Sequence, residues 1–395
     1  MLDYFNESKQ PREEFERKMD WCYQLKNIIS KHNPDWLFNI VPTGSTVTGL
    51  ATKNCDLDVA IHIPQAARVL NIEYDNIPED EMKNHWRRRQ LEILQIVRIT
   101  LKNDEQIRSR INWEKGVQLV QAQIQILKIE TVDEIECDIS VVMEPFLSSM
   151  HNSFMIWHLV HIDQRFAPLC AVVKQWGSST GVKNPKDGGF NSYALVLLVI
   201  HFLQCGTSPP ILPNLSKVYE GCNFIAMNDM EYPLLLDFDA PLPNELPVIR
   251  QNYGTVSRLF LEFLHYYHKF DFSCNYISMR ESRVLSRFNS PNPNVRDEKL
   301  KEVYIEDPFD AHNPGRTVRN LRNIRKIINE TLNMFIPQKD PTNSIENQRK
   351  NFHFPQLNDI ILMKTSQEYN NDVREDFGSN FFHNDAGPST STDIF

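Results

Sequence analysis

Apolar residues recur with two different periods along the chain, and this difference predicts where helices and strands lie. Residues 11–30 carry apolar side chains at helical spacing, and Asn33-Pro34 ends that pattern. A second long helical pattern covers 79–101. Four runs are typical of strands: 38–42, 57–63, 117–129 and 136–142. The first part of the sequence therefore predicts a mixed α/β module with a small sheet.

Helical patterns dominate from residue 152 onward. The predicted helices cover 152–161, 165–176, 192–203, 256–267 and 316–336. We expect the proline-containing segments 233–247 and 288–299 to be surface connections. Beyond about residue 337 the sequence is polar, with too few clustered apolar residues to fold by itself, so we expect a flexible tail. These patterns favour the α+β fold class, with a mixed first half and a mostly helical second half.

Composition and cysteine usage bear on compartment and partners. The 395 residues include 42 Lys and Arg and 51 Asp and Glu, for a formal net charge of −9. The longest apolar run, YALVLLVIHFL, is about half of a membrane-spanning length, so we expect no membrane association. The seven cysteines form no CxxC pair, and the charged N-terminus has no signal-peptide core. We therefore expect reduced thiols in the cytoplasm, with the nucleus or a granule as alternatives.

The most informative stretch is VPTGSTVTGLATKNCDLDVAIHIP, which contains Gly44, Ser45, Asp56 and Asp58. Alternate side chains of a strand share one face, so both aspartates point the same way, with apolar Leu57 between them. Carboxylates this close repel unless a hard divalent cation lies between them, and Mg²⁺ leaves positions open for phosphates. A Gly-Ser loop beside such a site can wrap a triphosphate with its N–H groups. The pattern favours nucleotidyl or phosphoryl transfer by two metal ions, and an exposed acidic strand end is the alternative.

This arrangement of Gly-Ser, a spacer and Asp-apolar-Asp resembles the nucleotidyltransferase superfamily, especially its cytoplasmic poly(A) polymerases and terminal uridylyltransferases. Four further blocks follow in the family's order: RFAPLCAVVKQWGSSTGV, GGFNSYALVLLVIHFLQ, PPILPNL and YIEDPFDAHNPGRTV. The resemblance implies a third carboxylate on a later strand, for which Asp138 is the best candidate and Glu136 the competitor on the same face. Asp56, Asp58 and Asp138 would hold Mg²⁺, with Mn²⁺ as an alternative.

The resemblance also implies a two-lobed architecture, with the nucleotide lying between the lobes. An N-terminal helix in 1–33 would pack on the central domain. Residues 34–145 would form the catalytic domain, 146–336 the helical PAP-associated domain, and 337–395 the tail.

Four residues of the second half resemble nucleotide contacts, and each has a structural alternative. Asn152 resembles the asparagine that binds the ribose hydroxyls, and otherwise would cap a helix. Lys174 resembles a triphosphate-contacting lysine, and otherwise would extend its ammonium to water. Ser192 could meet a phosphate or cap its helix. Tyr193 resembles the ring on which the base stacks, and otherwise would be a core tyrosine.

The resemblance implies that the stretch after the IEDPF motif contacts the base, and that Asp307 in this motif is a nucleotide-binding residue. His312 precedes an asparagine, as in uridylyltransferases, but the spacing is the shorter one of adenylyltransferases. Ser178 stands where uridylyltransferases often carry a second lysine, which favours ATP. Val142-Met143 replaces the family's usual asparagine pair, which weakens the case for strict base selection. The pattern slightly favours ATP, with UTP and mixed incorporation as alternatives.

The implied function is template-independent addition of AMP from a ribonucleoside triphosphate to RNA 3′ ends. Addition of UMP or of mixed nucleotides is the main alternative. A small-molecule nucleotidyltransferase, a cyclic-nucleotide synthase and an inactive scaffold are more distant ones. Basic residues are local, at 85–89 and 315–326, where they could grip RNA or simply form solvated helix faces. The acidic balance and the absence of an added RNA-binding module lead us to expect an RNA-binding adaptor protein.

Overall fold

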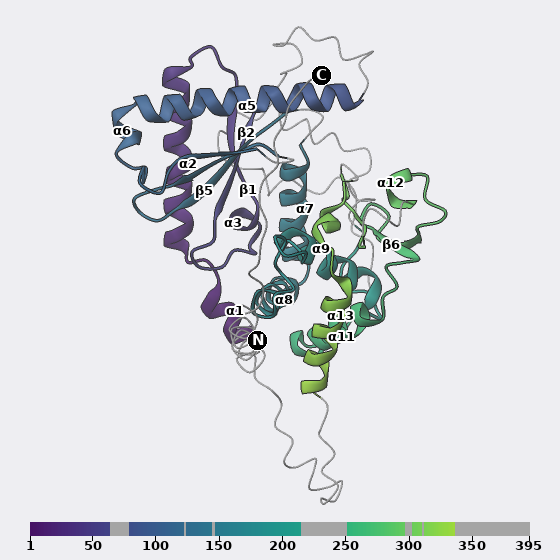
Figure 1. The fold of residues 1–395 in the computed structure, drawn as a ribbon. Coiled ribbons are helices and arrows are strands. Elements are labelled where there is room, and N and C mark those ends of the chain that lie inside the picture. Colours follow the sequence, from purple (N-terminus) through teal and green to yellow (C-terminus); the bar gives the residue numbers. More distant parts are fainter. Residues whose placement is uncertain are drawn as a thin grey trace, which may run out of the picture.

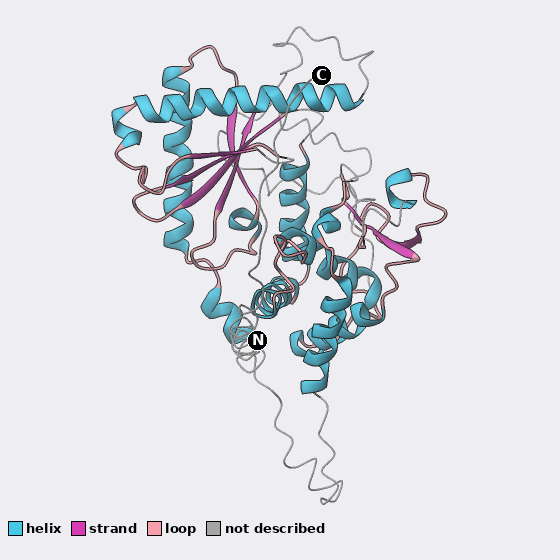
Figure 2. Cartoon of the chain, in the orientation of Figure 1, coloured by secondary structure: helices cyan, strands magenta, loops and turns pink. Residues whose placement is uncertain are grey.

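A computed structural model of the chain has a sheet-containing part and a mainly helical part (Figure 1). The residues that the structure describes are 1–63, 79–121, 124–143, 147–214, 251–296, 302–309 and 312–335. The connection expected at 233–247 and the tail expected from 337 lie outside these residues, as does part of 288–299. Figure 2 shows one fan of strands beneath α5 (Glu79–Asn103) and a second small group of strands among the later helices.

The main sheet has five strands in the order β1-β2-β5-β4-β3. The strands are β1 (Asn39–Thr43), β2 (Leu57–His62), β3 (Gln118–Val120), β4 (Ile126–Glu130) and β5 (Glu136–Val142). β2 and β5 run parallel, and the other neighbouring pairs are antiparallel. The parallel pair lies in the interior of the sheet, where both strands are hydrogen-bonded on both sides.

The prediction of a single strand over 117–129 is wrong, because this stretch contains two antiparallel strands, β3 and β4. Gln118 pairs with Lys128 across them. Glutamines alternate with apolar residues through the reversal, and no glycine or proline marks it. A period-two pattern therefore continues where the chain turns back. This reversal places Lys128 beside β5.

The two faces of the main sheet contact different cores. Leu57, Val59 and Ile61 of β2 pack in one apolar cluster with α2 (Arg12–His32) and α5. Ala60, on the opposite face, belongs to the cluster formed by the later helices. Successive strand side chains point to opposite faces, so the sequence LDVAIH divides its side chains between the two cores. Asp58 shares the Ala60 face, which is the face toward the helical part.

The N-terminal residues split between these two parts. α1 (Leu2–Ser8) lies against α8 (Phe166–Thr180), and Tyr4 Oη donates to Gln175 Oε1 at 3.0 Å. α2 instead packs on β1 and α5, with Trp21 and Leu25 fully buried. Pro11 precedes α2, and acidic residues in its first turn and basic residues in its last complement the helix dipole. Only α1 thus has the packing expected for the whole segment 1–33.

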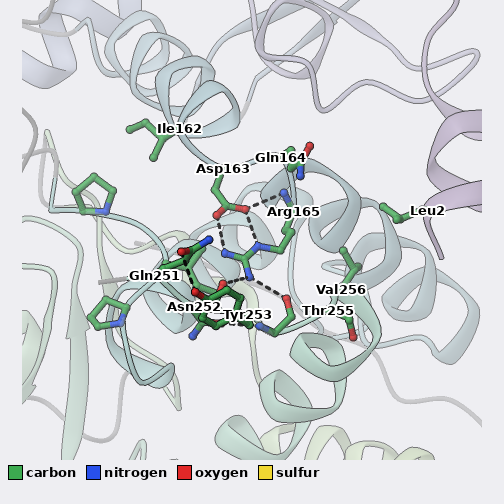
Figure 3. Close-up of a pocket in the computed structure, with 14 residues that line it drawn as sticks. Leu2, Ile162, Asp163, Gln164, Arg165, Gln251, Asn252, Tyr253, Thr255 and Val256 are labelled. Carbon is green, nitrogen blue, oxygen red and sulfur yellow. Dashed lines mark hydrogen bonds and ion pairs between the residues drawn. The ribbon is translucent and has the colours of Figure 1, made fainter. Parts of the chain in front are cut away.

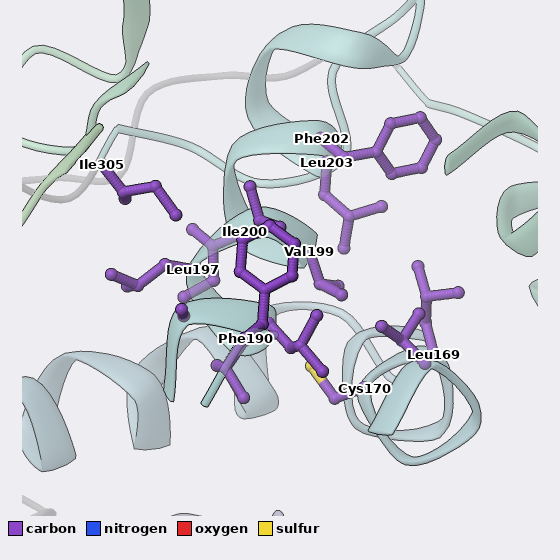
Figure 4. Packing of buried hydrophobic residues seen from close by; sticks show 14 of the residues in the cluster. Leu169, Cys170, Phe190, Leu197, Val199, Ile200, Phe202, Leu203 and Ile305 are labelled. Atoms are coloured by element: carbon purple, nitrogen blue, oxygen red, sulfur yellow. The ribbon is translucent and has the colours of Figure 1, made fainter. Parts of the chain in front are cut away.

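The helical part consists mainly of α7 (Ser148–Ile162), α8, α9 (Ser192–His201), α11 (Val256–Lys269) and α13 (Leu321–Met334). In Figure 4, Leu197 and Ile200 of α9 lie in one packed cluster with Leu169 of α8. Three side chains accept hydrogen bonds from N–H groups in the first turns of α9, α11 and α13: Asn191, Thr255 and Asn320. Each satisfies a donor that has no partner within its helix. None of the helices that the structure describes is long and apolar enough to cross a membrane.

A second sheet lies within the helical part, which the sequence patterns did not predict. Its order is β7-β6-β8, formed by β6 (Asn275–Ser278), β7 (Arg283–Ser286) and β8 (Ile305–Glu306). Shorter helical segments complete the described fold: α3 (Ser45–Thr48), α6 (Glu105–Arg108), η2 (Phe202–Gly206), α12 (Pro293–Arg296) and η4 (Pro314–Thr317). Strands of two to four residues are too short for a periodic signal. β8 matters for the site because it ends immediately before Asp307.

Candidate active site

Four polar side chains form a row across the main sheet. Thr43 pairs with Asp58, Asp58 with Asp138, and Asp138 with Lys128, on β1, β2, β5 and β4 respectively. Neighbouring strands lie about 4.8 Å apart, so residues in register on one face are side by side. The register of the sheet therefore brings Asp58 and Asp138 together, although they are far apart in sequence.

Asp56 joins this pair from the residue just before β2. Carboxylate oxygens of Asp56, Asp58 and Asp138 all lie within 4.8 Å of one another. Asp56 is exposed and the other two are partly buried. Glu136, the competing candidate, is exposed at the start of β5, where it pairs with Glu130, and is not part of the group. The structure thus brings the three predicted aspartates together.

The group holds more negative charge than its protein surroundings neutralise. Burial, followed by the charges of Asp56 and Asp138, raises the pKa of Asp58 to about 7. Lys128 offsets part of this charge, since its Nζ lies 2.8 Å from Oδ1 and 2.7 Å from Oδ2 of Asp138. The group thus offers three carboxylates as oxygen ligands, and the ionised form of Asp58 is unfavourable without a nearby positive charge. Such a set of ligands fits a hard divalent cation.

Gly44 borders this group, and replacing it by any other residue would force the backbone or the side chain of Asp58 to move. Its φ is +70°, and a Cβ added there would lie 2.2 Å from Oδ2 of Asp58. Only glycine adopts this φ readily while leaving room for the carboxylate. The N–H of Gly44 donates to Ser153 Oγ at 2.9 Å, which ties the loop to α7. Ser45 follows as the partly exposed first residue of α3.

The predicted nucleotide contacts of the helical part meet at Asp307. Its Oδ2 accepts from Asn152 Nδ2 at 3.1 Å and from Tyr193 Oη at 2.7 Å, and its Oδ1 accepts from the N–H of Phe309 at 2.9 Å. Asp307 is fully buried, and His312 Nδ1 lies 3.8 Å from its Oδ2. These bonds orient Asn152, whose Oδ1 is buried with no hydrogen-bond partner among the residues that the structure describes. A ligand hydroxyl could donate to that oxygen.

Two structural alternatives for these residues do not hold. Asn152 lies inside α7 and not at its start, so it is no helix cap. Asn191 caps α9 by accepting from the N–H of Ala194, which leaves exposed Ser192 without that role. Tyr193 is partly buried, with its hydroxyl on Asp307.

The aspartate group and the Asp307 cluster are linked through α7 and α8. Ser153, which accepts from Gly44, is the neighbour of Asn152 along α7. Lys174 of α8 donates from Nζ to the carbonyl of Leu50 at 3.2 Å, across the two parts of the chain. The metal-type site and the polar cluster therefore adjoin through these contacts.

A second lysine near Lys174 was missed by the sequence analysis. The pKa of Lys183 is lowered, first by burial and then by the charge of Lys174, while the charge of Asp56 acts in the opposite direction. Lys183 follows the C-terminal glycine of α8 by two residues, where no helical pattern singles it out. Lys128 could have been noticed, because it is a charged residue between two apolar residues of β4.

Three cavities formed by the described residues are not lined by Asp56, Asp58 or Asp138. One cavity, of about 760 Å³, lies between the end of α7 and the start of α11 (Figure 3). Arg165 lies within it, with a two-pronged contact to Asp163 and bonds to the carbonyls of Asn252 and Gly254. These polar groups pair with one another, so the aspartate group remains the stronger candidate for chemistry.

Two parts of the chain match models of known protein families. Residues 1–156 match the central palm domain of mitochondrial-like poly(A) RNA polymerase, and residues 255–313 match the Cid1 family poly A polymerase. The first match contains the three aspartates, and the second contains Asp307 and His312.

Individual relatives extend this similarity. Poly(A) RNA polymerase gld-2 homolog A of Drosophila melanogaster is 28% identical over 332 residues, which are 82% of this chain and 22% of that protein. Poly(A) RNA polymerase GLD2 of Homo sapiens is 31% identical over 233 residues, which are 58% of this chain and 45% of that protein. The chain thus spans less than half of the length of either relative.

Solved structures share the fold. A structure of Cid1, studied for its RNA terminal uridylyl transferase activity, is 23% identical with a TM-score of 0.61, covering 86% of this chain and 94% of that one. The GLD-2/RNP-8 complex is 24% identical with a TM-score of 0.62, covering 88% and 96%. The predicted α+β fold, with a small mixed sheet and a mostly helical second half, is confirmed.

Proposed function

We propose that this chain, which belongs to the nucleotidyltransferase superfamily in its poly(A) polymerase and terminal uridylyltransferase branch, adds nucleotides to RNA 3′ ends without a template. The donor would be a ribonucleoside triphosphate, and AMP is the unit that we favour. The supporting observation is the convergence of Asp56, Asp58 and Asp138 next to the Asn152–Asp307 cluster. One group can bind the metal and phosphates, and the other can bind the sugar and base.

The aspartates would hold Mg²⁺ or Mn²⁺, which would lower the pKa of the 3′-hydroxyl that attacks the α-phosphate and offset charge on the pyrophosphate that leaves. Asp58 and Asp138 are fixed by the hydrogen-bonded ladder of β2 and β5, so their separation is set before any ligand arrives. Gly44 keeps the space beside Asp58 open and presents a backbone turn to the triphosphate. The protein thus contributes mainly positioning and preorganised charge.

The helical part would select and hold the nucleotide. The Oδ1 of Asn152, which has no partner in the described part of the chain, can accept from a ribose hydroxyl, which a deoxyribonucleotide lacks at the 2′ position. Tyr193, held by its hydroxyl on Asp307, would present its ring to the base. Lys174, with Ser192 at the start of α9, would contact the triphosphate.

UMP addition is the second candidate, and His312 is the observation that favours it. Its backbone carbonyl accepts from the N–H of Asp307 at 2.9 Å, so its side chain is held beside the same cluster. We expect His312→Leu to change the ratio of ATP to UTP incorporation. His265→Leu, at an exposed position of α11, is the control that should leave the ratio unchanged. An unaltered ratio in the His312 variant would exclude base reading by this residue.

A tailing assay with 5′-labelled RNA, Mg²⁺ and each ribonucleotide separately tests the proposed function. We expect ATP to give the longest tails, and Asp58→Asn to reduce the rate by orders of magnitude while the fold is kept. Glu136→Gln removes a carboxylate from the same sheet outside the group and should remain active. Near-normal tailing by the Asp58 variant would reject the assignment. Absence of tailing by the unmodified protein with every nucleotide would favour a small-molecule substrate or an inactive scaffold.

The proposal includes the wider organisation of the molecule. Residues 34–145 would be the catalytic domain and 146–336 the central domain, with action in the cytoplasm. This chain is acidic, whereas contacts with RNA phosphates need a basic surface. An RNA-binding adaptor would therefore supply the affinity for RNA. The related GLD-2 was solved as a complex with another protein, RNP-8.

A further inference from the structure

Asp56 differs from the other two aspartates in how its position is fixed. Asp58 and Asp138 sit within paired strands, whereas Asp56 precedes the first residue of β2. It follows an irregular stretch in which Asn54 has a φ of +56°. A side chain outside the ladder needs other contacts to hold it within the tolerance that metal binding requires.

Lys18 of α2 supplies such a contact to the loop that precedes β2. Its side chain is 2% exposed, and its Nζ donates to the carbonyl of Cys55 at 2.7 Å. That carbonyl belongs to the peptide plane that joins Cys55 to Asp56. The next peptide plane is held by Thr46 Oγ1, which donates to the carbonyl of Asp56 at 3.3 Å. Because peptide planes are rigid, fixing both of them fixes the backbone of Asp56.

Besides a contact to Cys55 Sγ at 3.2 Å, this ammonium makes two bonds that tie the loop to the N-terminal segment. Nζ also donates to Glu14 Oε1 at 2.7 Å and Gln10 Oε1 at 2.8 Å. Glu14 Oε2 in turn accepts from the N–H of Asn54 at 3.1 Å. One buried ion pair therefore binds two consecutive residues of the loop, Asn54 through its N–H and Cys55 through its carbonyl.

A buried ion pair is a costly way to gain stability alone. Removing an ammonium and a carboxylate from water is so unfavourable that their attraction barely offsets it, and apolar replacements are often as stable. What an ammonium offers here is directed hydrogen bonds to a carbonyl and to the side chains of Gln10, Glu14 and Cys55 at once. Its charge also acts on the site, since Lys18 is among the groups that lower the pKa of Asp58, which burial and the neighbouring aspartates raise.

We propose that Lys18 is a positioning residue of the active site, which sets the Cys55–Asp56 peptide so that Asp56 can share a cation with Asp58 and Asp138. This inference rests on the proposed function, because it assumes that the three aspartates bind a divalent cation. Glu14 is its necessary partner. The N-terminal segment that carries them is thereby part of the catalytic scaffold and not an appendage.

The test measures Mn²⁺ binding by electron paramagnetic resonance with no RNA or nucleotide present. Glu14→Gln/Lys18→Met removes both charges together, so no unpaired buried charge remains, and the amide oxygen introduced at position 14 can still accept from the N–H of Asn54. We expect this double variant to fold and to bind Mn²⁺ at least about tenfold more weakly, as is typical when groups supporting metal ligands are lost. Near-equal Mn²⁺ affinity in the double variant and the unmodified protein would overturn the proposal.

A matched control separates positioning from general stability. At the other end of α2, Lys31 Nζ and His32 Nε2 contact Asp104 Oδ2 at 2.8 and 3.0 Å. Asp104→Asn breaks this ionic contact and should lower the melting temperature with Mn²⁺ affinity unchanged. If Asp104→Asn weakens Mn²⁺ binding as much as the double variant does, the effect is one of stability and the proposal fails. Asp58→Asn should abolish binding, and if it does not, the proposed metal site itself is wrong, whatever Lys18 does.

Discussion

Lys128 and Asp138 pair directly across β4 and β5, with Nζ 2.8 Å and 2.7 Å from the two carboxylate oxygens. The lysine side chain is 47% exposed and that of Asp138 is 16% exposed. The ammonium thus meets the third aspartate on both oxygens, where a cation would also bind. The ammonium of Lys128 and a metal ion are therefore alternative partners for the carboxylate of Asp138.

Replacing Lys128 should make the protein more dependent on metal. In Lys128→Met the three carboxylates lose their nearest protein counter-charge, so we expect a lower melting temperature without metal and a larger increase on adding Mg²⁺. Thermal unfolding with EDTA and with Mg²⁺ measures both effects. Lys115→Met is the control, since Lys115 pairs with Glu130, outside the aspartate group. The same Mg²⁺-induced shift in the Lys128 variant and the unmodified protein would contradict the prediction.

The raised pKa of Asp58 predicts how stability without metal changes with pH. The pKa rises from 3.8 in the unfolded chain to about 7, chiefly through burial. Between these values the folded protein holds a proton that the unfolded chain has released, so the contribution of Asp58 to stability falls as pH rises and reaches its minimum above about pH 7. In Asp58→Asn this dependence is lost.

Buried histidines change the folding stability with pH in the opposite direction to Asp58 over part of this pH range. Burial lowers the pKa of His151 to about 4 and that of His201 to about 3, so they favour folding as pH rises toward 6.5. Comparing Asp58→Asn with the unmodified protein cancels their effect. Urea unfolding in EDTA should show the variant gaining relative stability from pH 5 to pH 8. A constant difference would mean that Asp58 ionises normally.

Loss of the Asn152 amide should weaken discrimination between ribose and deoxyribose. We expect Asn152→Ala to reduce the preference for ATP over dATP in kcat/KM by roughly tenfold or more, because a hydrogen bond to the hydroxyl is lost. Steady-state tailing with the two nucleotides measures this ratio. His161→Ala, at the exposed end of the same helix, should preserve it. Equal ratios in the Asn152 variant and the unmodified protein would assign the asparagine a structural role on Asp307.

The sequence predicted the elements that carry long periodic patterns, and it singled out the three aspartates. β2 and β5 begin and end close to the predicted residues because alternation and apolar runs set their limits. The partners of those aspartates were harder to find. Lys128 reaches Asp138 only through the register of β4, and Lys18 reaches Cys55 from a helix 37 residues earlier. Such contacts depend on tertiary packing, which a periodic pattern does not encode.

Two lysines close to one another predict where the triphosphate binds. Lys183 has a lowered pKa, through burial first and then through the charge of Lys174, so a bound anion would offset both effects. We expect Lys183→Met to raise KM for the nucleotide roughly tenfold or more with a smaller effect on kcat, as for loss of a charged hydrogen bond. Lys186→Met, at an exposed position of the same loop, is the matched control and should leave KM unchanged. A KM for the Lys183 variant equal to that of the control would show that this pair of lysines does not hold the phosphates, and would leave the Gly44 loop and the metal as their binding groups.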